Sequence, residues 1–317
     1  MVNRSKLSIK KILLAQPRGF CAGVERAIEC IEETLKYRKQ PVYCFREIVH
    51  NRYVVDQLRQ RGVRFVHRIS DIPVGAVVIF SAHGVAPDVR KEAENRQLVV
   101  IDATCPFVNK VHAEVRNYAE NGYAILLIGD RNHDEVIGVA GEAPANIRIV
   151  ENTAEAEKVN VADADRIAAV TQTTLSVSET SKIMSILRRR FPALVTPADG
   201  DICYATQDRQ EAVRKMVEFC DLILVLGAVN SSNTNRLVEV ARADNGNAAL
   251  VSNIEDVKNL DFAGVETLGI TAGASTPEEF VEETIDYLKN CADLTVENVR
   301  GRKEDMHFSL PQGVIPE

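Results

Sequence analysis

The 317-residue sequence lacks any apolar run that approaches the roughly 18 residues of a membrane-spanning helix. Its basic first residues lead only into the short apolar run 12–15, which is too short for the core of a signal peptide. We therefore expect a cytoplasmic protein without membrane contact. The sequence also lacks a net positive charge, because its formal net charge is -7, whereas a nucleic-acid surface needs a basic face. We expect no nucleic-acid partner.

Two cofactor patterns are missing as well. None of the seven cysteines has the C-x-x-C spacing of a zinc ribbon or a thioredoxin motif, and a long chain without a secretory signal is not expected to form a disulfide framework. No G-x-G-x-x-G stretch is present. The sequence therefore offers no recognisable site for NAD(P)H or a flavin.

What the sequence does contain is a cysteine at a strand-to-helix junction, three times over. Cys21 follows the apolar run 12–15 and precedes a stretch with apolar residues at helical spacing. Cys105 and Cys203 have the same setting. A helix N-terminus favours the thiolate, which attacks electrophiles and binds metals.

The other cysteines fall inside expected elements or near helix ends, where cysteine is most often a small buried residue. These are Cys30, Cys44, Cys220 and Cys291.

Short β-type runs alternate with amphipathic helical runs along the whole chain, which is typical of α/β proteins with mostly parallel sheets. Three segments, each headed by one of the three junction cysteines, share this order without an alignable sequence. We expect three similar α/β domains over 11–104, 105–199 and 200–290, and a C-terminal tail over 291–317. The expected strands are 12–15, 42–45, 77–80, 98–101, 124–128, 147–150, 167–170, 222–226, 248–251 and 267–270.

Five of these strands end in unusually polar loops. In open sheets of this class, ligands bind beyond the carboxyl ends of the strands, so the loops predict one composite site. The loops cover residues 80–84, 129–135, 171–174, 227–233 and 271–275.

Three thiols in one structural role have several interpretations. A nucleophile needs only one thiol and a nearby base, which leaves two thiols unexplained. Three thiolates suit a metal site with an open coordination position, either zinc with a bound water or a [4Fe–4S] cluster with one iron that the protein does not ligate. Three unrelated buried cysteines are the simplest alternative.

Three histidines, His50, His83 and His133, lie in strand-to-helix loops. A single loop histidine is more often a solvated or capping residue than a catalytic one, but these three coincide with the polar loops. Glu135 taken alone is a surface carboxylate, whereas beside His133 and facing an anion it becomes a candidate proton donor with a raised pKa. The other histidines lack such settings and are expected to be structural or surface residues. They are His67, His112 and His307.

Hydroxyl and amide side chains stand ahead of two expected helices. One helix follows residue 235, and the other is expected to begin with Thr276 as its cap. Backbone N–H groups at a helix start favour a phosphate or diphosphate, although the same side chains also serve as ordinary caps. The donors concerned are Ser231, Ser232, Asn233 and Ser275.

Eight short motifs occur in a fixed order over residues 11–290. They are P-R-G-F-C-A-G-V (17–24), V-H-N-R-Y-V-V (49–55), F-S-A-H-G-V (80–85), D-A-T-C-P (102–106), T-Q-T-T-L-S-V (171–177), D-I-C-Y-A-T (201–206), N-S-S-N (230–233) and T-A-G-A-S (271–275). Together they closely resemble the 4-hydroxy-3-methylbut-2-enyl diphosphate reductase family, which acts last in the methylerythritol phosphate route to isoprenoids.

The resemblance implies a trefoil-like arrangement of three α/β domains around one [4Fe–4S] cluster with one free iron. The implied cluster ligands are Cys21, Cys105 and Cys203. The implied diphosphate contacts are His50, His83, His133, Ser231, Ser232, Asn233 and Ser275. Thr173 and Glu135 are implied to lie near the hydroxyl that leaves. The family usually has His-Pro-Glu where this chain has His-Asp134-Glu.

The implied reaction is the two-electron reductive dehydroxylation of (E)-4-hydroxy-3-methylbut-2-enyl diphosphate to isopentenyl and dimethylallyl diphosphates. The free iron would bind the substrate hydroxyl, and Glu135, helped by Thr173, would supply protons. Electrons would come from an external donor such as a ferredoxin or flavodoxin, since no nucleotide motif is present. Two other classes stay open: a tris-cysteine zinc hydrolase of a phosphorylated small molecule with Glu135 as base, and a non-catalytic iron–sulfur redox sensor.

Overall fold

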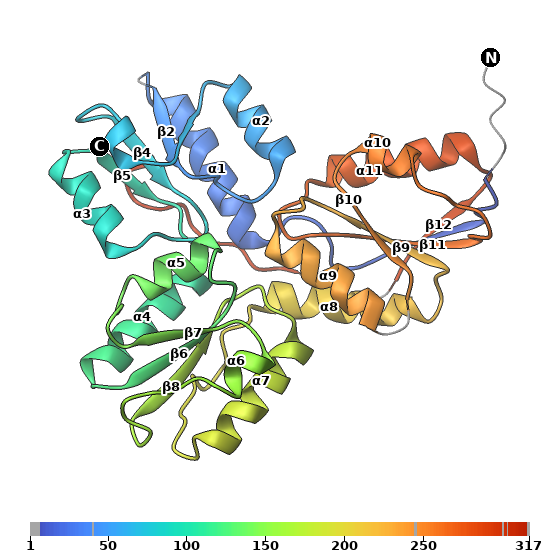
Figure 1. Cartoon of the computed structure of the whole chain (residues 1–317). Coiled ribbons are helices and arrows are strands. Elements are labelled where there is room, and N and C mark those ends of the chain that lie inside the picture. The colour runs from blue at the N-terminus through green and yellow to red at the C-terminus, as the bar shows by residue number, and fades with distance from the viewer. Residues whose placement is uncertain (1–6, 40, 244–245, 300, 303, 316–317) are drawn as a thin grey trace. The chain divides into compact units, whose positions relative to one another are not determined.

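The computed structural model describes residues 7–39, 41–243, 246–299, 301–302 and 304–315. These residues form three sheets of parallel strands, each accompanied by helices (Figure 1). They divide into two compact units, described separately below. Unit 1 contains the described residues of 1–21, 50–52 and 204–306, and unit 2 contains those of 22–49, 53–203 and 307–317. Among the described helices, none combines the length and the apolar character that a membrane crossing requires.

Unit 1 is built on one five-stranded parallel sheet, ordered β10-β9-β11-β1-β12. Its strands are β10 (Ala248–Val251), β9 (Leu222–Leu226), β11 (Thr267–Ala272), β1 (Lys11–Leu14) and β12 (Thr295–Asn298), and its helices are α8 (Tyr204–Val217), α9 (Ser232–Ala243), α10 (Ile254–Lys258) and α11 (Glu278–Cys291). In β9, Ile223 and Val225 pack with α8 and α9, whereas Leu224 and Leu226 pack with α10 and α11. Helices therefore cover both faces of the sheet, which explains its continuous apolar strands.

Unit 2 contains two smaller parallel sheets, ordered β3-β2-β4-β5 and β7-β6-β8. Their strands are β2 (Val42–Phe45), β3 (Arg64–Val66), β4 (Val77–Phe80), β5 (Val99–Asp102), β6 (Ala124–Ile128), β7 (Ile147–Val150) and β8 (Ile167–Thr171). The accompanying helices are α1 (Ala22–Tyr37), α2 (Arg52–Gln60), the short 3-10 helix η1 (Ile69–Asp71), α3 (Pro87–Asn95), α4 (Pro106–Glu120), α5 (Asp134–Ala140), α6 (Thr153–Ala156) and α7 (Val177–Arg190).

The packing of β6 positions two of the polar loops. Its residues Ile125 and Leu127 pack with α4 and α5, and Leu126 and Ile128 pack with α7 on the opposite face. The start of α5 and the loop after β8 are thereby held at the carboxyl end of the same sheet, where parallel sheets bind ligands.

The predicted α/β class is confirmed, and all ten expected strands are present with ends shifted by at most two residues. Two strands were not predicted. Strand β3 has only three residues, none of them fully buried, and β12 has the mostly exposed sequence Thr-Val-Glu-Asn. Short strands with polar residues carry little of the apolar periodicity on which such predictions depend.

The first strand of the chain lies between two strands from its other end, because β1 pairs with both β11 and β12. The loop that carries Cys21 therefore leaves the same sheet that carries the loop after β11. The division into domains 11–104, 105–199 and 200–290 stays a prediction.

One predicted cap is wrong. Helix α11 begins at Glu278 after the N-cap residue Pro277, and no side chain caps it. Thr276 is fully buried, and its hydroxyl donates a hydrogen bond to the carbonyl of Leu226 at 3.0 Å. Tertiary packing has redirected this hydroxyl from the helix start to the end of strand β9.

Candidate active site

The three junction cysteines lie where the sequence predicts. Cys21 and Cys203 directly precede α1 and α8, and Cys105 is the N-cap of α4. All three are partly exposed. Each of these cysteine residues therefore keeps part of its surface exposed at the start of a helix, where the helix dipole stabilises negative charge.

The same backbone hydrogen bond holds each of these cysteines. In every case the cysteine N–H donates to a carbonyl two residues beyond the end of a strand, namely β11, β4 or β8. The bonds run from Cys21 to Ala274 (3.2 Å), from Cys105 to Ala82 (3.0 Å) and from Cys203 to Thr173 (3.1 Å). Each cysteine is thus fastened to one of the polar loops that the sequence singled out.

The remaining cysteines behave as structural residues. Cys30 and Cys44 are fully buried, and burial raises the pKa of Cys30 to about 12 and that of Cys44 well above its usual range. Burial likewise raises the pKa of Cys220 to about 12, and Cys291 ends α11. No disulfide joins any of the seven cysteines, all of which lie in the described part of the chain.

Glu135 is a buried carboxyl group in the first turn of α5, with 2% of its surface exposed. Its Oε1 accepts a hydrogen bond from the Thr173 N–H at 2.6 Å, and its Oε2 accepts one from the Thr173 hydroxyl at 3.0 Å. Burial raises the pKa of Glu135 to about 7, against the lowering effect of these bonds, and the negative charge of Asp201 adds to the rise. The group can therefore hold or release a proton near neutral pH.

His133 caps the helix that carries Glu135. Its Nδ1 accepts a hydrogen bond from the Glu135 N–H at 3.2 Å, which places the ring proton on Nε2. The ring of His83 meets that of His133 edge to face, with centroids 5.4 Å apart. Unit 2 therefore brings together four predicted site residues from two loops and a helix start: His83, His133, Glu135 and Thr173.

A buried glutamine joins the two loops that carry Glu135 and Thr173. Gln172, 1% exposed, accepts a hydrogen bond from the Asp130 N–H at 3.0 Å and donates one to the Thr174 hydroxyl at 3.1 Å. Asp201 supports the same region, because its Oδ2 accepts from the Thr171 N–H at 2.8 Å. Neither role was predicted, since periodicity does not reveal the partner of a polar residue.

In unit 1, the start of α9 is tied to the loop after β11. The Ser231 hydroxyl accepts from the Thr234 N–H at 3.3 Å and so caps α9. Asn233 is 4% exposed, and its Oδ1 accepts from the Ala274 N–H at 2.8 Å. Ser232 is the first residue of α9. The polar residues 231–233 therefore stand at a helix start of the kind that binds anions.

Ser275 and His50 also lie together in unit 1. The Ser275 hydroxyl donates to the backbone carbonyl of His50 at 3.0 Å, and Ser275 is 6% exposed. Its proton is thus already engaged, and an anion would have to compete with this carbonyl for it.

Comparison with known proteins identifies the family. The model of the LytB protein family matches residues 12–289. The chain belongs to the LytB family. It is 49% identical to the 4-hydroxy-3-methylbut-2-enyl diphosphate reductase of Mycobacterium sp. strain KMS, over 98% of this chain and 93% of the relative. It is 47% identical to the enzyme of that name from Acidothermus cellulolyticus, over 98% and 92% of the two chains.

Solved structures agree with this LytB assignment. The E-1-hydroxy-2-methyl-but-2-enyl-4-diphosphate reductase from Plasmodium falciparum is similar with a TM-score of 0.91 and 39% identity, and 97% of each chain is covered. A structure of (E)-4-hydroxy-3-methyl-but-2-enyl diphosphate reductase is similar with a TM-score of 0.62 and 31% identity, over 89% of this chain and 100% of the other. The family resemblance of the sequence motifs is confirmed.

LytB proteins bind an iron–sulfur cluster, and the cysteines of this chain fit such a group. Thiolate is the usual ligand of iron–sulfur clusters. Cys21, Cys105 and Cys203 are partly exposed and form no disulfide, whereas Cys30 and Cys44 are buried among apolar residues with raised thiol pKa values. Accessibility thus separates the three candidate ligands from Cys30 and Cys44. Cys220 and Cys291 are also partly exposed, but neither stands at the start of a helix.

Proposed function

We propose that the protein reduces (E)-4-hydroxy-3-methylbut-2-enyl diphosphate to isopentenyl and dimethylallyl diphosphates, the last step of the methylerythritol phosphate route. Near full-length similarity to reductases of this name supports the reaction. The single observation that carries the chemistry is the buried Glu135–Thr173 pair, because loss of a hydroxyl as water needs a proton donor active near neutral pH. We place the enzyme in the cytoplasm.

Cys21, Cys105 and Cys203 would hold one [4Fe–4S] cluster, with one iron left without a protein ligand. When bound, the cluster would pass two electrons, one at a time, from the donor to the substrate and would offer a Lewis-acidic iron to the substrate hydroxyl. This assignment is supported by the common setting of the three cysteines, each at a helix start and each held by the same backbone bond. An external donor such as a ferredoxin or flavodoxin delivers the electrons.

The diphosphate is bound by neutral donors together with histidines. The N-terminus of α9 offers backbone N–H groups together with Ser231, Ser232 and Asn233. Ser275 and the histidines His50, His83 and His133 supply further donors, and the Nδ1 bond of His133 directs its Nε2–H toward other partners. Hydrogen bonds to a charged phosphate oxygen are about twice as strong as neutral ones, so such a set needs no cluster of lysine or arginine.

The proton that leaves with the hydroxyl is carried on Oε2 of Glu135. The Thr173 N–H can only donate, so Oε1 must remain an acceptor, and protonation falls on Oε2. The Thr173 hydroxyl lies 3.0 Å from Oε2 and can accept this proton while donating its own. Thr173 therefore orients the acid and lies next to the proton that is transferred.

The cluster assignment is tested by single serine substitutions at the three cysteines. After anaerobic purification, Cys21→Ser, Cys105→Ser and Cys203→Ser should each lose most iron and sulfide together with the brown colour, because serine is a poor ligand for this cluster. Cys291→Ser, at the end of α11, is the matched control and should keep a full cluster. Full iron and sulfide in all three variants would overturn the assignment, and zinc without sulfide in the wild-type protein would favour the hydrolase alternative.

A further inference from the structure

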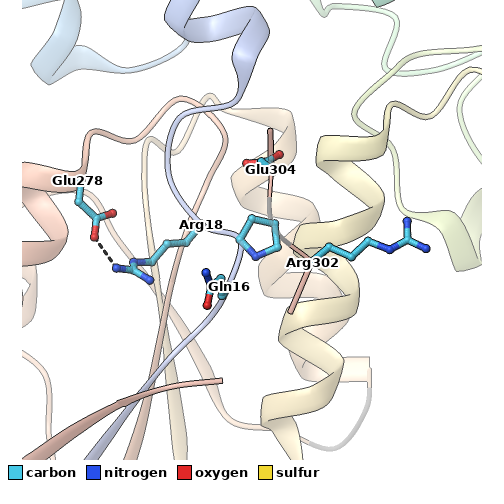
Figure 2. A pocket seen from close by; sticks show the side chains of 6 residues that line it. Gln16, Arg18, Glu278, Arg302 and Glu304 are labelled. Atoms are coloured by element: carbon cyan, nitrogen blue, oxygen red, sulfur yellow. Dashed lines mark hydrogen bonds and ion pairs between the residues drawn. The ribbon is translucent and has the colours of Figure 1, made fainter. Parts of the chain in front are cut away.

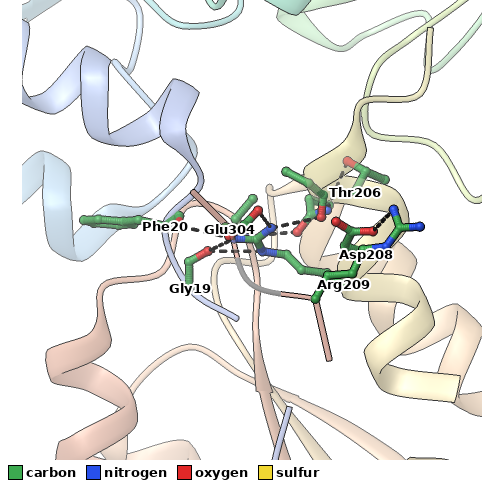
Figure 3. A network of polar contacts seen from close by, with 10 residues as sticks. Gly19, Phe20, Thr206, Asp208, Arg209 and Glu304 are labelled. Atoms are coloured by element: carbon green, nitrogen blue, oxygen red, sulfur yellow. Dashed lines mark hydrogen bonds and ion pairs between the residues drawn. The ribbon is translucent and has the colours of Figure 1, made fainter. Parts of the chain in front are cut away.

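Arg209 in α8 is the largest fully buried side chain among the described residues. A guanidinium keeps its charge at any physiological pH, so burying it is costly unless every N–H group is paired. Figure 3 shows that Arg209 points toward the backbone of Gly19 and Phe20 and toward Glu304. The contacts of this side chain therefore indicate what its burial stabilises.

Three hydrogen bonds from Arg209 go to the loop that carries Cys21. Its Nε and Nη2 donate to the Gly19 carbonyl at 3.2 and 2.8 Å, and Nη2 also donates to the Phe20 carbonyl at 3.1 Å. These two carbonyls immediately precede Cys21. The Cys21 N–H, which belongs to the same peptide group as the Phe20 carbonyl, donates to Ala274, so the peptide group that leads into Cys21 is held at both its C=O and its N–H.

The charge of Arg209 is balanced by Glu304, 95 residues away in the sequence. The pair is bidentate, with Nη1 to Oε1 at 2.7 Å and Nη2 to Oε2 at 2.8 Å. Such fork-to-fork pairs are the strongest that arginine makes. Since Arg209 has no exposed surface and only 18% of the Glu304 side chain is exposed, water contributes little to screening the pair.

A second contact fastens the same C-terminal segment to the same loop. A Cβ atom at Gly301 would lie 1.5 Å from the carbonyl oxygen of Gln16, so only glycine allows this approach. Close by, the loop and the segment line one polar pocket of about 260 Å³ (Figure 2). Its lining residues are Gln16, Pro17, Arg18, Glu278, Arg302 and Glu304.

We propose that Arg209 and Glu304 are positioning residues for Cys21, and that the C-terminal residues Gly301 and Glu304 thereby control how this cysteine holds its ligand. Arg209 fixes the two carbonyls before Cys21, and Glu304 keeps Arg209 in place. The part of the inference that concerns the cluster rests on the proposed function, whereas the coupling of the segment to the loop does not.

The coupling is tested first without the cluster, by hydrogen exchange of residues 16–24 in the apoprotein. Glu304→Ala removes the carboxylate that balances the buried charge of Arg209, so exchange in this loop should accelerate by about 10²-fold. Gly301→Ala should act in the same direction, and Glu304→Asp should partly restore protection. Arg302→Gln is the matched control, since it removes an ion pair to Asp208 from the same segment but no contact to Arg209. Unchanged exchange in both Glu304→Ala and Gly301→Ala would overturn the proposal.

The cluster-bound protein gives a signature that a merely structural role would not produce. Glu304→Gln leaves an excess positive charge beside the Cys21 loop and should shift the cluster midpoint potential upward. Arg209→Gln leaves an excess negative charge and should shift it downward. Shifts of the same sign in both variants would contradict the positioning role. A wild-type protein that binds no cluster would refute the proposed function alone, and the exchange experiment would still decide the coupling.

Discussion

Glu135 shows how burial and hydrogen bonding compete at a single residue. Two hydrogen bonds from Thr173 favour the carboxylate, yet desolvation is the larger effect and brings the pKa to about 7. A glutamate in water would be almost fully ionised at neutral pH. The fold thus turns an ordinary carboxylate into an acid that is half protonated under physiological conditions.

Replacing this acid should abolish proton delivery without disturbing the site. Glu135→Gln keeps the size and the acceptor for the Thr173 N–H, so turnover should fall by roughly 10²-fold or more while substrate affinity changes little. Wild-type turnover should decline as pH rises through about 7, and the variant should lack this decline. Steady-state rates with excess artificial reductant measure both effects. Glu155→Gln is the control, because it makes the same change in the first turn of another helix, α6. Near-normal turnover of Glu135→Gln would contradict the assignment and make His133 the next candidate donor.

The same substitution has a predicted effect on stability, and its sign follows from the raised pKa. Folded Glu135 binds its proton more tightly than the unfolded chain does, so its contribution to stability is complete below pH 4.5 and is lost as pH rises to about 7. The loss amounts to about 3 kcal/mol. Urea unfolding of the apoprotein should therefore show that Glu135→Gln is relatively more stable than wild type above pH 7 and not below pH 4.5. Equal differences at both pH values would contradict this account.

At the scale of elements, an ion pair holds the start of α5. Asp134, the first residue of α5, forms this ion pair with Arg46. Proline at this position would fix the backbone through its ring. Here the helix dipole stabilises the negative charge of Asp134, and the ion pair with Arg46 connects the start of α5 to the loop after β2. The ion pair thus stabilises the helix start that carries Glu135.

This interpretation predicts a double-mutant cycle. Arg46→Gln should destabilise the protein by about 1 kcal/mol, the usual scale of a partly exposed ion pair. In the Asp134→Pro background the same change should cost almost nothing. Asp134→Pro should itself fold, because His133 already has the extended backbone (φ -75, ψ 139) that a residue before proline requires. Chemical denaturation measures all four proteins, and additive effects would exclude the coupling.

Helix α9 provides a second prediction at this scale. Ser232→Ala removes a donor at the helix start and should raise KM for the diphosphate substrate by about tenfold, with full iron content. Asn233→Ala should raise KM and also lower iron content, because Asn233 holds the Ala274 N–H while the Ala274 carbonyl holds the N–H of Cys21. Iron analysis and KM together distinguish a loss of substrate binding alone, expected for Ser232→Ala, from a loss that also affects the cluster, expected for Asn233→Ala. Unchanged KM in both variants would remove α9 from the binding site.

At the scale of the whole molecule, one local arrangement recurs on all three sheets. In each case a loop follows a strand, namely β11, β4 or β8. The backbone carbonyl of the second loop residue accepts a hydrogen bond from a cysteine N–H, and a helix begins directly after that cysteine. The arrangement is built from distant parts of the chain, most clearly where β1 pairs with β11 and β12. The Cys21 loop follows β1, so its position depends on strands that come from the other end of the chain.

Local patterns were enough to predict ten of the twelve described strands, the α/β class, the polar loops and the helix-start positions of the three cysteines, because each depends on the periodicity of a few neighbouring residues. The family motifs added the candidate site. Pairing partners and burial depend on residues far apart in the chain, and only the folded structure decided them. In the folded protein the Thr276 hydroxyl bonds to Leu226 instead of capping α11, and burial raises the pKa of Glu135. The charge of Arg209 lies inside the protein beside Glu304.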